Sequence, residues 1–408
     1  MTREHGEAST EDMKSNRKSP RGDATHCIHA GEERHGKNAP LATEIALASV
    51  FTLPGVEELR RYAQGKSSAY LYTRYANPTT RAAEVKLAAL EGGEDCVITA
   101  SGMAAAMVAV LACCQSGDEI VSMLDIYGGT LKLFQNLLPR LGIRTRLAPF
   151  HELDRIEKYF NRRTRMLFLE SPTNPTLRCA DLARLAKIGR RHKACVVVDN
   201  TFATPILQKP LALGADMVLH SATKYLGGHS DLTAGALVGA KSWITPARQM
   251  MVQSGGCLDP AASYLLIRGV KTLEVRVERA CKNAARIAEM LAGHPKVTRV
   301  LYPGFAGNEG HEAARRQMSD FGTMVSFEIK GGGRAAERFI DRLGLWYLAT
   351  SLGGVESTVS YPVLSSHVGL GAKTLKLLDV SPATVRLSVG IESVDDLIAD
   401  LDQALDAA

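Results

Sequence analysis

The sequence predicts an α/β fold built on a mostly parallel central sheet, and two of its features point to this class. Short runs rich in Val, Ile, Leu and Met alternate along the chain with helix-like stretches. The apolar runs are almost continuous, which is typical of strands that crossover helices bury on both faces. The chain has 408 residues, of which 45% are hydrophobic, so it can bury large cores in two or more domains.

The strands of this central sheet are expected at the apolar runs, which are residues 95–101, 118–123, 165–171, 194–200, 216–221 and 234–239. Helices are expected between them over 79–93 and 181–193. The longest apolar run, 103–114, is too short to cross a bilayer and is interpreted as a buried helix. We therefore expect no membrane segment.

A smaller α/β domain is expected in the C-terminal part of the chain. A helical stretch over 272–294 leads into more polar strands over 323–330, 357–362 and 384–390. A last helix is predicted over 393–405.

The charge of the chain indicates which kind of ligand it binds, and its cysteines indicate the cellular compartment. The net charge is +6, from 49 Lys and Arg against 43 Asp and Glu, without a long block of one sign. This balance weakly favours small anionic ligands and argues against nucleic acid. The eight cysteines form no CxxC pair and are interpreted as reduced core residues of a cytoplasmic protein. The charged N-terminal segment resembles neither a signal peptide nor a transit peptide.

Polar chemistry follows several of the predicted strands, where ligands bind in open parallel sheets. Gly102 and Met103 come at the start of a predicted helix, where free amides and the helix dipole favour a phosphate. A simple tight turn is the alternative there. Asp199 ends an apolar strand, so its carboxylate needs a cation or hydrogen bonds, unless it only caps the next segment.

The stretch "HSATKYLGGHSD" adds hydroxyl groups and a lysine at the next strand end. Ser221 and Thr223 can face an anion, and burial of Lys224 would expose a nucleophilic amine. A phosphate seat, a buried carboxylate and a desolvated lysine together match the needs of pyridoxal 5'-phosphate (PLP). In this interpretation Lys224 forms the Schiff base and Asp199 faces the pyridine nitrogen.

The chain resembles the Cys/Met-metabolism (trans-sulfuration) family of PLP enzymes, which includes cystathionine γ-lyase, cystathionine γ-synthase, cystathionine β-lyase and methionine γ-lyase. The resemblance extends from about residue 25 to the C-terminus. It is carried by "YTRYANPT", "ASGMAA", "DIYGGT", "ESPTNP", "VVDNTFATP", "HSATKYLGGHSD", "SLGGVES" and "VRLSVGIE", in the family's order. It implies PLP fold type I, the aspartate-aminotransferase-like fold, and a homotetramer built from dimers.

The resemblance also implies roles for individual residues. Lys224 resembles the PLP lysine and Asp199 its pyridinium partner, and the phosphate-binding positions fall on Gly102, Met103, Ser221 and Thr223. Tyr72 and Arg74 resemble a pair that reaches into the neighbouring subunit's phosphate site, so a monomer is expected to be inactive.

Further positions of this resemblance concern the cofactor ring and the substrate. Tyr127 resembles the tyrosine that stacks on the ring and can protonate a leaving group, although it could be a turn aromatic. Asn174, Ser351 and Arg386 resemble the groups that meet the substrate carboxylate and a cofactor oxygen, although Arg386 could form an ordinary ion pair.

The positions that separate the subfamilies disagree in this chain. Methionine γ-lyases carry a cysteine two residues after the stacking tyrosine, and here that position is Gly129. Cystathionine γ-enzymes usually carry Glu where Thr350 stands, and bacterial β-lyases tend to carry Trp where Leu352 stands. The sequence leaves open how Thr350 and Gly129 affect specificity, although Thr350 is taken as a substrate-binding position.

We therefore predict a carbon–sulfur lyase that acts by γ-elimination on cystathionine, methionine or homocysteine. Gamma-replacement, as in cystathionine γ-synthase or O-acylhomoserine sulfhydrylase, is the alternative within the family. A glycine-rich stretch at 328–336, "EIKGGGRAA", raises a weaker alternative, a nicotinamide-dependent oxidoreductase. A non-catalytic protein on the same fold is a third possibility, which the intact cofactor positions disfavour.

We divide the chain into an arm over 1–76 that reaches the neighbouring subunit, a large PLP-binding domain over 77–275 and a C-terminal domain over 276–408. His26, His29 and His35 lie in the arm without the paired spacing of a ligand set, so no metal site is expected.

Overall fold

The computed structural model describes residues 22–32 and 38–408. Its strands are β1 (Asp95–Thr99), β2 (Glu119–Met123), β3 (Arg144–Ala148), β4 (Thr164–Glu170), β5 (Cys195–Asp199), β6 (Met217–His220), β7 (Gly235–Gly239), β8 (Val297–Leu301), β9 (Met324–Ile329), β10 (Tyr347–Leu348), β11 (Thr358–Ser360) and β12 (Thr384–Ser388). Its α-helices are α1 (Asp23–His29), α2 (Val56–Ala63), α3 (Pro78–Glu91), α4 (Gly102–Cys113), α5 (Gly128–Lys132), α6 (Leu182–Arg191), α7 (Thr204–Leu207), α8 (Lys241–Ser254), α9 (Pro260–Val270), α10 (Leu273–Gly293), α11 (His311–Gln317), α12 (Gly333–Arg342), α13 (Ala372–Leu377) and α14 (Val394–Asp406).

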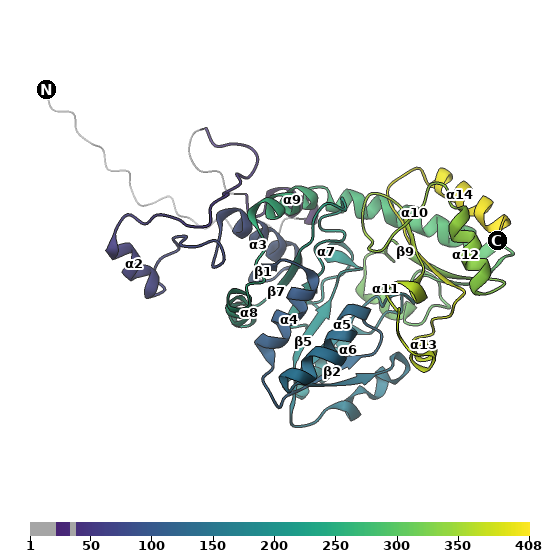
Figure 1. Cartoon of the computed structure of the whole chain (residues 1–408), viewed down its shortest axis with the longest axis horizontal. Helices are drawn as coiled ribbons and strands as arrows, with labels where there is room; N and C mark the ends of the chain where they lie inside the picture. The colour runs from purple at the N-terminus through teal and green to yellow at the C-terminus, as the bar shows by residue number, and fades with distance from the viewer. Residues whose placement is uncertain (1–21, 33–37) are drawn as a thin grey trace.

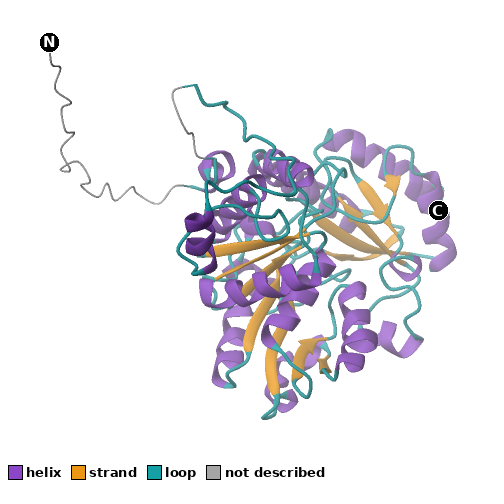
Figure 2. Ribbon diagram, turned by 60° about the vertical axis from the view of Figure 1, so that its left-hand side comes forward, coloured by secondary structure: helices purple, strands orange, loops and turns teal. Residues whose placement is uncertain are grey.

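The large sheet has seven strands in the order β1-β7-β6-β5-β4-β2-β3. The pairs from β3 across to β6 are all parallel, and β7 runs antiparallel to both β1 and β6. Helices lie on both sides of these strands (Figure 2). The expected mostly parallel α/β sheet is therefore confirmed, with one antiparallel strand and with β3, which the sequence did not reveal.

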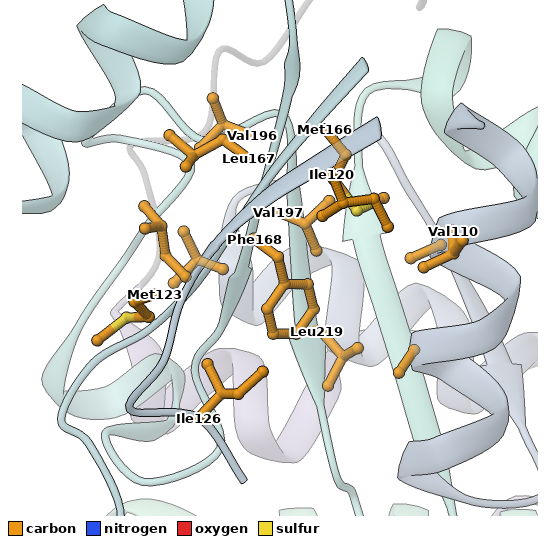
Figure 3. Close-up of a cluster of buried hydrophobic side chains, with 14 of the residues drawn as sticks. Val110, Ile120, Met123, Ile126, Met166, Leu167, Phe168, Val196, Val197 and Leu219 are labelled. Carbon is orange, nitrogen blue, oxygen red and sulfur yellow. The ribbon is translucent and has the colours of Figure 1, made fainter. Parts of the chain in front are cut away.

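The core of the large sheet explains the apolar runs of the sequence. Phe168 on β4, Val197 on β5 and Ile120 on β2 lie in one buried cluster with side chains from α4 and β6 (Figure 3). The rings of Phe134 and Phe168 meet edge to face with centroids 5.2 Å apart. Close packing of this kind fixes the strands against one another, so their carboxyl ends are held in a constant arrangement.

The C-terminal part forms a second sheet of five strands in the order β10-β11-β12-β9-β8. Its core is a separate buried cluster, to which α10, α12 and α14 contribute. These three helices lie together beside β9 (Figure 1). The predicted smaller α/β region is present, and α10 runs without a break past the domain boundary that we placed at residue 276.

The N-terminal part is divided between α1, whose Cys27 is buried in a core cluster with α3, and a segment around α2 that extends away from both sheets (Figure 1). Helix α2 has no buried residue and projects from the body (Figure 1). Residues 1–21 and 33–37 of the predicted arm lie outside the described residues. Within the described ranges, no helix is both long and apolar enough to cross a membrane.

Candidate active site

A cavity of about 610 Å³ lies at the carboxyl ends of the central strands and is closed on one side by the C-terminal part of the chain. Every predicted site residue except Tyr72 and Arg74 lines it. These residues are Gly102, Met103, Tyr127, Asn174, Asp199, Ser221, Thr223, Lys224, Thr350, Ser351 and Arg386. Positions up to 284 residues apart in the sequence thus meet in one pocket, because the strands of the large sheet end at a common edge and the C-terminal part, with Arg386 on β12, packs against that edge.

One end of the cavity is formed by the start of α4. Ser101 caps this helix by accepting a hydrogen bond from the Ala104 amide at 3.1 Å, so the amides of Gly102 and Met103 precede the first helical hydrogen bonds. A Cβ atom on Gly102 would lie only 2.8 Å from Cβ of Ser221. Glycine therefore permits the helix to approach the Ser221 loop, and the two walls form a seat suited to a phosphate.

Thr201 links this loop to the carboxylate of Asp199. Its amide and its hydroxyl donate to Asp199 Oδ1 at 3.0 and 2.5 Å, and its hydroxyl accepts from the Ser221 amide at 2.9 Å. The Thr223 hydroxyl is held by the backbone of Ala234, whose amide donates to it at 3.0 Å. The loop that carries the predicted phosphate ligands is thus fixed to the strand end that carries the carboxylate.

Burial sets the electrostatics of Asp199, which is 7% exposed. It raises the pKa of this carboxyl group, while the hydrogen bonds from Thr201 oppose the rise. Beneath it, His220 Nε2 lies 2.6 Å from Glu91 Oε1, and Asn200 donates to the same oxygen at 3.1 Å. A cation in the cavity next to Asp199 would relieve the cost of its charge.

Lys224 enters the cavity from the loop after β6 and is half-buried. Burial, followed by the positive charge of Arg386, lowers the pKa of its ammonium group to about 8. Its Nζ donates to Ser351 Oγ at 2.6 Å. Ser351 has a φ of 84°, a conformation that is rare outside glycine, so its hydroxyl is placed at some cost in backbone energy. Such strained residues cluster at functional sites.

Arg386 lies on β12 and lines this pocket. It is the one cationic side chain among the site residues predicted in the C-terminal part. Nη1 donates to Asn174 Oδ1 at 2.8 Å and Nη2 donates to the Ser351 carbonyl at 3.1 Å. Its Nε is buried and has no hydrogen-bond partner among the described residues. Burial lowers the pKa of this guanidinium group to about 10, so it remains charged at neutral pH. It is suited to bind a carboxylate.

Tyr127 precedes α5, and its side chain is 44% exposed at the cavity. Its amide donates to Glu170 Oε2 at 2.7 Å. A Cβ atom on Gly129 would collide with the Tyr127 ring, lying 3.0 Å from Cζ and closer still to Cε1. Gly129 therefore allows the ring to occupy this position.

Tyr72 and Arg74 lie elsewhere, in the exposed N-terminal part. Arg74 donates to the Val252 carbonyl at 2.9 Å, and its guanidinium carbon lies 5.6 Å from the ring centroid of Tyr72 and 4.8 Å from that of Tyr75. These two predicted residues are not brought to the cavity of their own chain.

Several cavity residues were missed by the sequence analysis. Glu170 ends β4 as Asp199 ends β5, so the rule of inspecting strand ends could have found it. Thr201 directly follows the "VVDN" strand end and could have been found in the same way. Ser366 also lines the cavity, and no local signal marks it. The buried Glu91–His220 pair, which does not line the cavity, joins residues 129 apart in the sequence and was missed for the same reason.

The donor set of the cavity fits PLP. Helix amides and hydroxyl groups can hold a phosphate, Asp199 can pair with a protonated ring nitrogen, and the Lys224 amine can react with an aldehyde. The nicotinamide alternative fits poorly, because the glycine-rich turn before α12 follows β9, which is antiparallel to both of its neighbours. A dinucleotide site needs this turn between parallel strands.

The sequence analysis expected no metal site at three histidines of the arm. His26 and His29 lie on α1, and His35 lies outside the described residues. Within residues 22–32 and 38–408, no group of three or more His, Cys, Asp or Glu side chains is placed to hold a metal ion.

Comparisons with known proteins agree with this geometry. The family model for Cys/Met metabolism PLP-dependent enzymes matches residues 24–406. The chain is 41% identical over 385 residues to an L-methionine gamma-lyase of Fusobacterium nucleatum subsp. polymorphum, covering 94% of this chain and 97% of that one. It is 42% identical over 383 residues to a cystathionine gamma-synthase of Mycobacterium leprae (strain TN), covering 94% and 96%.

A solved structure of metB from Corynebacterium glutamicum aligns with a TM-score of 0.89 at 39% identity, covering 95% of this chain and 98% of that one. The resemblance, the fold type I architecture and the PLP cofactor predicted from the sequence are thereby confirmed, and the nicotinamide alternative is wrong. The chain belongs to the Cys/Met metabolism family of PLP-dependent enzymes.

Proposed function

We propose that the protein is a carbon–sulfur lyase that removes the γ-substituent of a sulfur amino acid such as cystathionine, methionine or homocysteine. The observation that carries this proposal is the meeting of Lys224, Arg386 and Asp199 in one cavity. An amine of lowered pKa, a buried guanidinium and a strand-end carboxylate are the groups needed to bind PLP and an α-amino acid together.

Each end of the cofactor has a partner in this proposal. The amides of Gly102 and Met103 and the hydroxyl groups of Ser221 and Thr223 hold the phosphate. Both hydrogen bonds from Thr201 end on Oδ1 of Asp199, which leaves Oδ2 for the ring nitrogen. Asn174 would meet a cofactor oxygen, and Lys224 Nζ would hold the aldehyde carbon until the substrate amine takes its place, which frees Nζ to act as a base. Bound PLP supplies an electron sink for the bonding electrons at Cα of the substrate.

The remaining groups bind the substrate and move protons. Arg386 binds the α-carboxylate, with Ser351 and Asn174 holding the guanidinium in place, and this fixes which Cα bond can be broken. Lys224 Nζ then removes the Cα proton as a general base, a role that its pKa of about 8 permits near neutral pH. Once a Cβ proton has also left, the bond between Cγ and sulfur can break, and the Tyr127 hydroxyl donates a proton to the leaving sulfur. Thr350 lies at the cavity wall, where it contacts the distal part of the substrate.

The arm supports a proposal of shared active sites in a cytoplasmic homotetramer. Tyr72 and Arg74 do not line their own cavity, and apolar side chains of the same N-terminal segment are exposed, including Leu41, Leu47 and Val50, which pairs with Tyr72. Mixing two inactive variants tests this. Lys224→Ala and Arg74→Ala subunits, unfolded together and refolded, should regain activity because hybrid assemblies contain one intact site. A mixture that stays inactive contradicts the sharing of sites.

Gamma-replacement is the second candidate, and Gly129 favours it. The position that carries cysteine in methionine γ-lyases has no side chain here, and the Mycobacterium leprae relative is named a cystathionine gamma-synthase. Both reactions begin with Cα proton loss and departure of the γ-substituent.

Product analysis separates the two candidates. The purified protein receives L-cystathionine, L-methionine or an O-acyl-homoserine, with and without a thiol. We expect 2-oxobutyrate from the sulfur amino acids without a thiol. Turnover only of O-acyl-homoserine, and only with a thiol, would contradict the lyase.

A further inference from the structure

Glu170 lines the candidate cavity and has been given no role. It is the last residue of β4, and the register of the sheet places it opposite Asp199, the last residue of β5. Both carboxyl groups are buried, with residue exposures of 4% and 7%. Two acids thus stand side by side at the strand ends, and Asp199 has the better reason to be ionised because, in the proposed function, it would pair with the ring nitrogen.

The surroundings of Glu170 disfavour its ionised form. Among the described residues it forms no ion pair, and the charged groups that act on it are the acids Asp199 and Asp125 and the guanidinium of Arg386. Asp125 is itself paired with Arg178 at 3.2 Å, and Arg386 is engaged by Asn174 and Ser351. Burial, and then the charge of Asp199, raises the pKa of the Glu170 carboxyl well above its usual range.

The hydrogen bond of Glu170 reaches the turn that carries Tyr127. The Tyr127 amide, which lies directly before α5, donates to Glu170 Oε2 at 2.7 Å. On the other side, the next residue, Gly128, packs so closely against the Ser366 carbonyl that a Cβ atom would have no room. The turn is therefore clamped between the end of β4 and the loop around Ser366.

We propose that Glu170 is a positioning residue, which holds the main chain of Tyr127 and does so as a neutral acid beside the ionised Asp199. A neutral carboxyl oxygen accepts the Tyr127 amide without placing a second negative charge near the ring nitrogen. The phenol then lies where it can reach the cofactor ring and the leaving group. This inference rests on the proposed roles of Asp199 and Tyr127 and is independent of which sulfur amino acid is the substrate.

The first test reads the protonation state directly. Infrared difference spectra of the PLP-loaded protein at pH 8, wild type minus Glu170→Gln, should contain the carbonyl stretch of a neutral carboxylic acid. Glu119→Gln is the matched control, because the hydrogen bond from Arg146 lowers the pKa of the Glu119 carboxyl and its spectrum should lose only carboxylate bands. A Glu170→Gln spectrum that loses carboxylate bands instead would overturn the neutral acid.

The second test reads the positioning role. Gln keeps an oxygen for the Tyr127 amide, so Glu170→Gln should retain kcat within about threefold, whereas Glu170→Ala should lose about 10²-fold in kcat with little change in KM. Glu170→Asp is too short to reach the amide and should lose kcat to a similar extent. It takes the place of Glu170→Ala in this test if the alanine variant folds poorly. Equal kcat in the Gln, Ala and Asp variants would overturn the role. A wrong substrate class would leave the infrared result intact and remove turnover in the wild type.

Discussion

Replacing Arg386 with alanine should separate substrate recognition from folding. The side chain is buried, and its guanidinium group is the proposed partner of the substrate carboxylate. Removal of one partner of a buried, hydrogen-bonded charge pair costs about 2 to 5 kcal/mol. We therefore expect kcat/KM for L-cystathionine to fall by roughly 30-fold to 5,000-fold, because each 1.36 kcal/mol corresponds to about a factor of ten. Arg386→Lys should recover part of this loss, since it restores the charge without the planar fork.

The chain offers a matched control in Arg276. It is also buried, burial also lowers its pKa to about 10, and it donates to the carbonyls of Tyr225 at 2.9 Å and Gly269 at 2.7 Å. Each alanine variant removes the donor of two hydrogen bonds to buried or partly buried acceptors, so both should lose about 1 to 3 kcal/mol of unfolding free energy in urea titrations. Only Arg386→Ala should also lose kcat/KM, because Arg276 does not line the cavity.

The reasoning would be refuted if the two variants lost kcat/KM equally, or if Arg386→Ala kept the wild-type value. A substrate analogue without the α-carboxylate sharpens the result. It should bind wild type and Arg386→Ala with similar affinity, because the group that distinguishes them is missing.

Three further predictions follow from the same geometry. The rate at which the apoprotein takes up PLP, followed by absorbance, should rise with pH with a midpoint of about 8, because the pKa of the Lys224 ammonium group is lowered to about 8. A midpoint above about 10, near the ordinary pKa of lysine, would contradict this. Asp199→Asn should lower turnover at least about 100-fold, and full activity would count against the role of Asp199. The same variant should not destabilise the apoprotein in thermal unfolding at pH 8, because burial raises the pKa of Asp199 and makes its charge unfavourable. Gly102→Ala should weaken PLP binding at least about tenfold, because its Cβ would lie 2.8 Å from that of Ser221, while Gly293→Ala, with open space around it, should bind PLP normally.

The strands that the sequence revealed are those buried on both faces. The run that ends in Asp199 is apolar at each inner position, and β5 is buried throughout. Strand β3 (Arg144–Ala148) was missed because it lies at the edge of the sheet and its arginines are exposed or half-exposed, which gives the pattern of a polar loop. The antiparallel direction of β7 leaves no mark on composition, since a strand buried on both faces reads alike in either direction.

The site was predictable where chemistry follows a strand end. Asp199 and Lys224 were found in this way, and both line the cavity. Glu170 has the same placement, but its partner, the amide of Tyr127, lies 43 residues away and only the folded sheet brings them together. The contact of Lys224 with Ser351 spans 127 residues and joins the two halves of the chain, so no local pattern contains it.

The most direct test of the account is to find which side chain carries the cofactor. The PLP-loaded protein is reduced with borohydride, digested and analysed by mass spectrometry. We expect the pyridoxyl mass on the peptide that contains Lys224, and the loss of both this label and the yellow colour in Lys224→Ala. A label on another lysine, or an unlabelled protein that still turns over a sulfur amino acid, would contradict it.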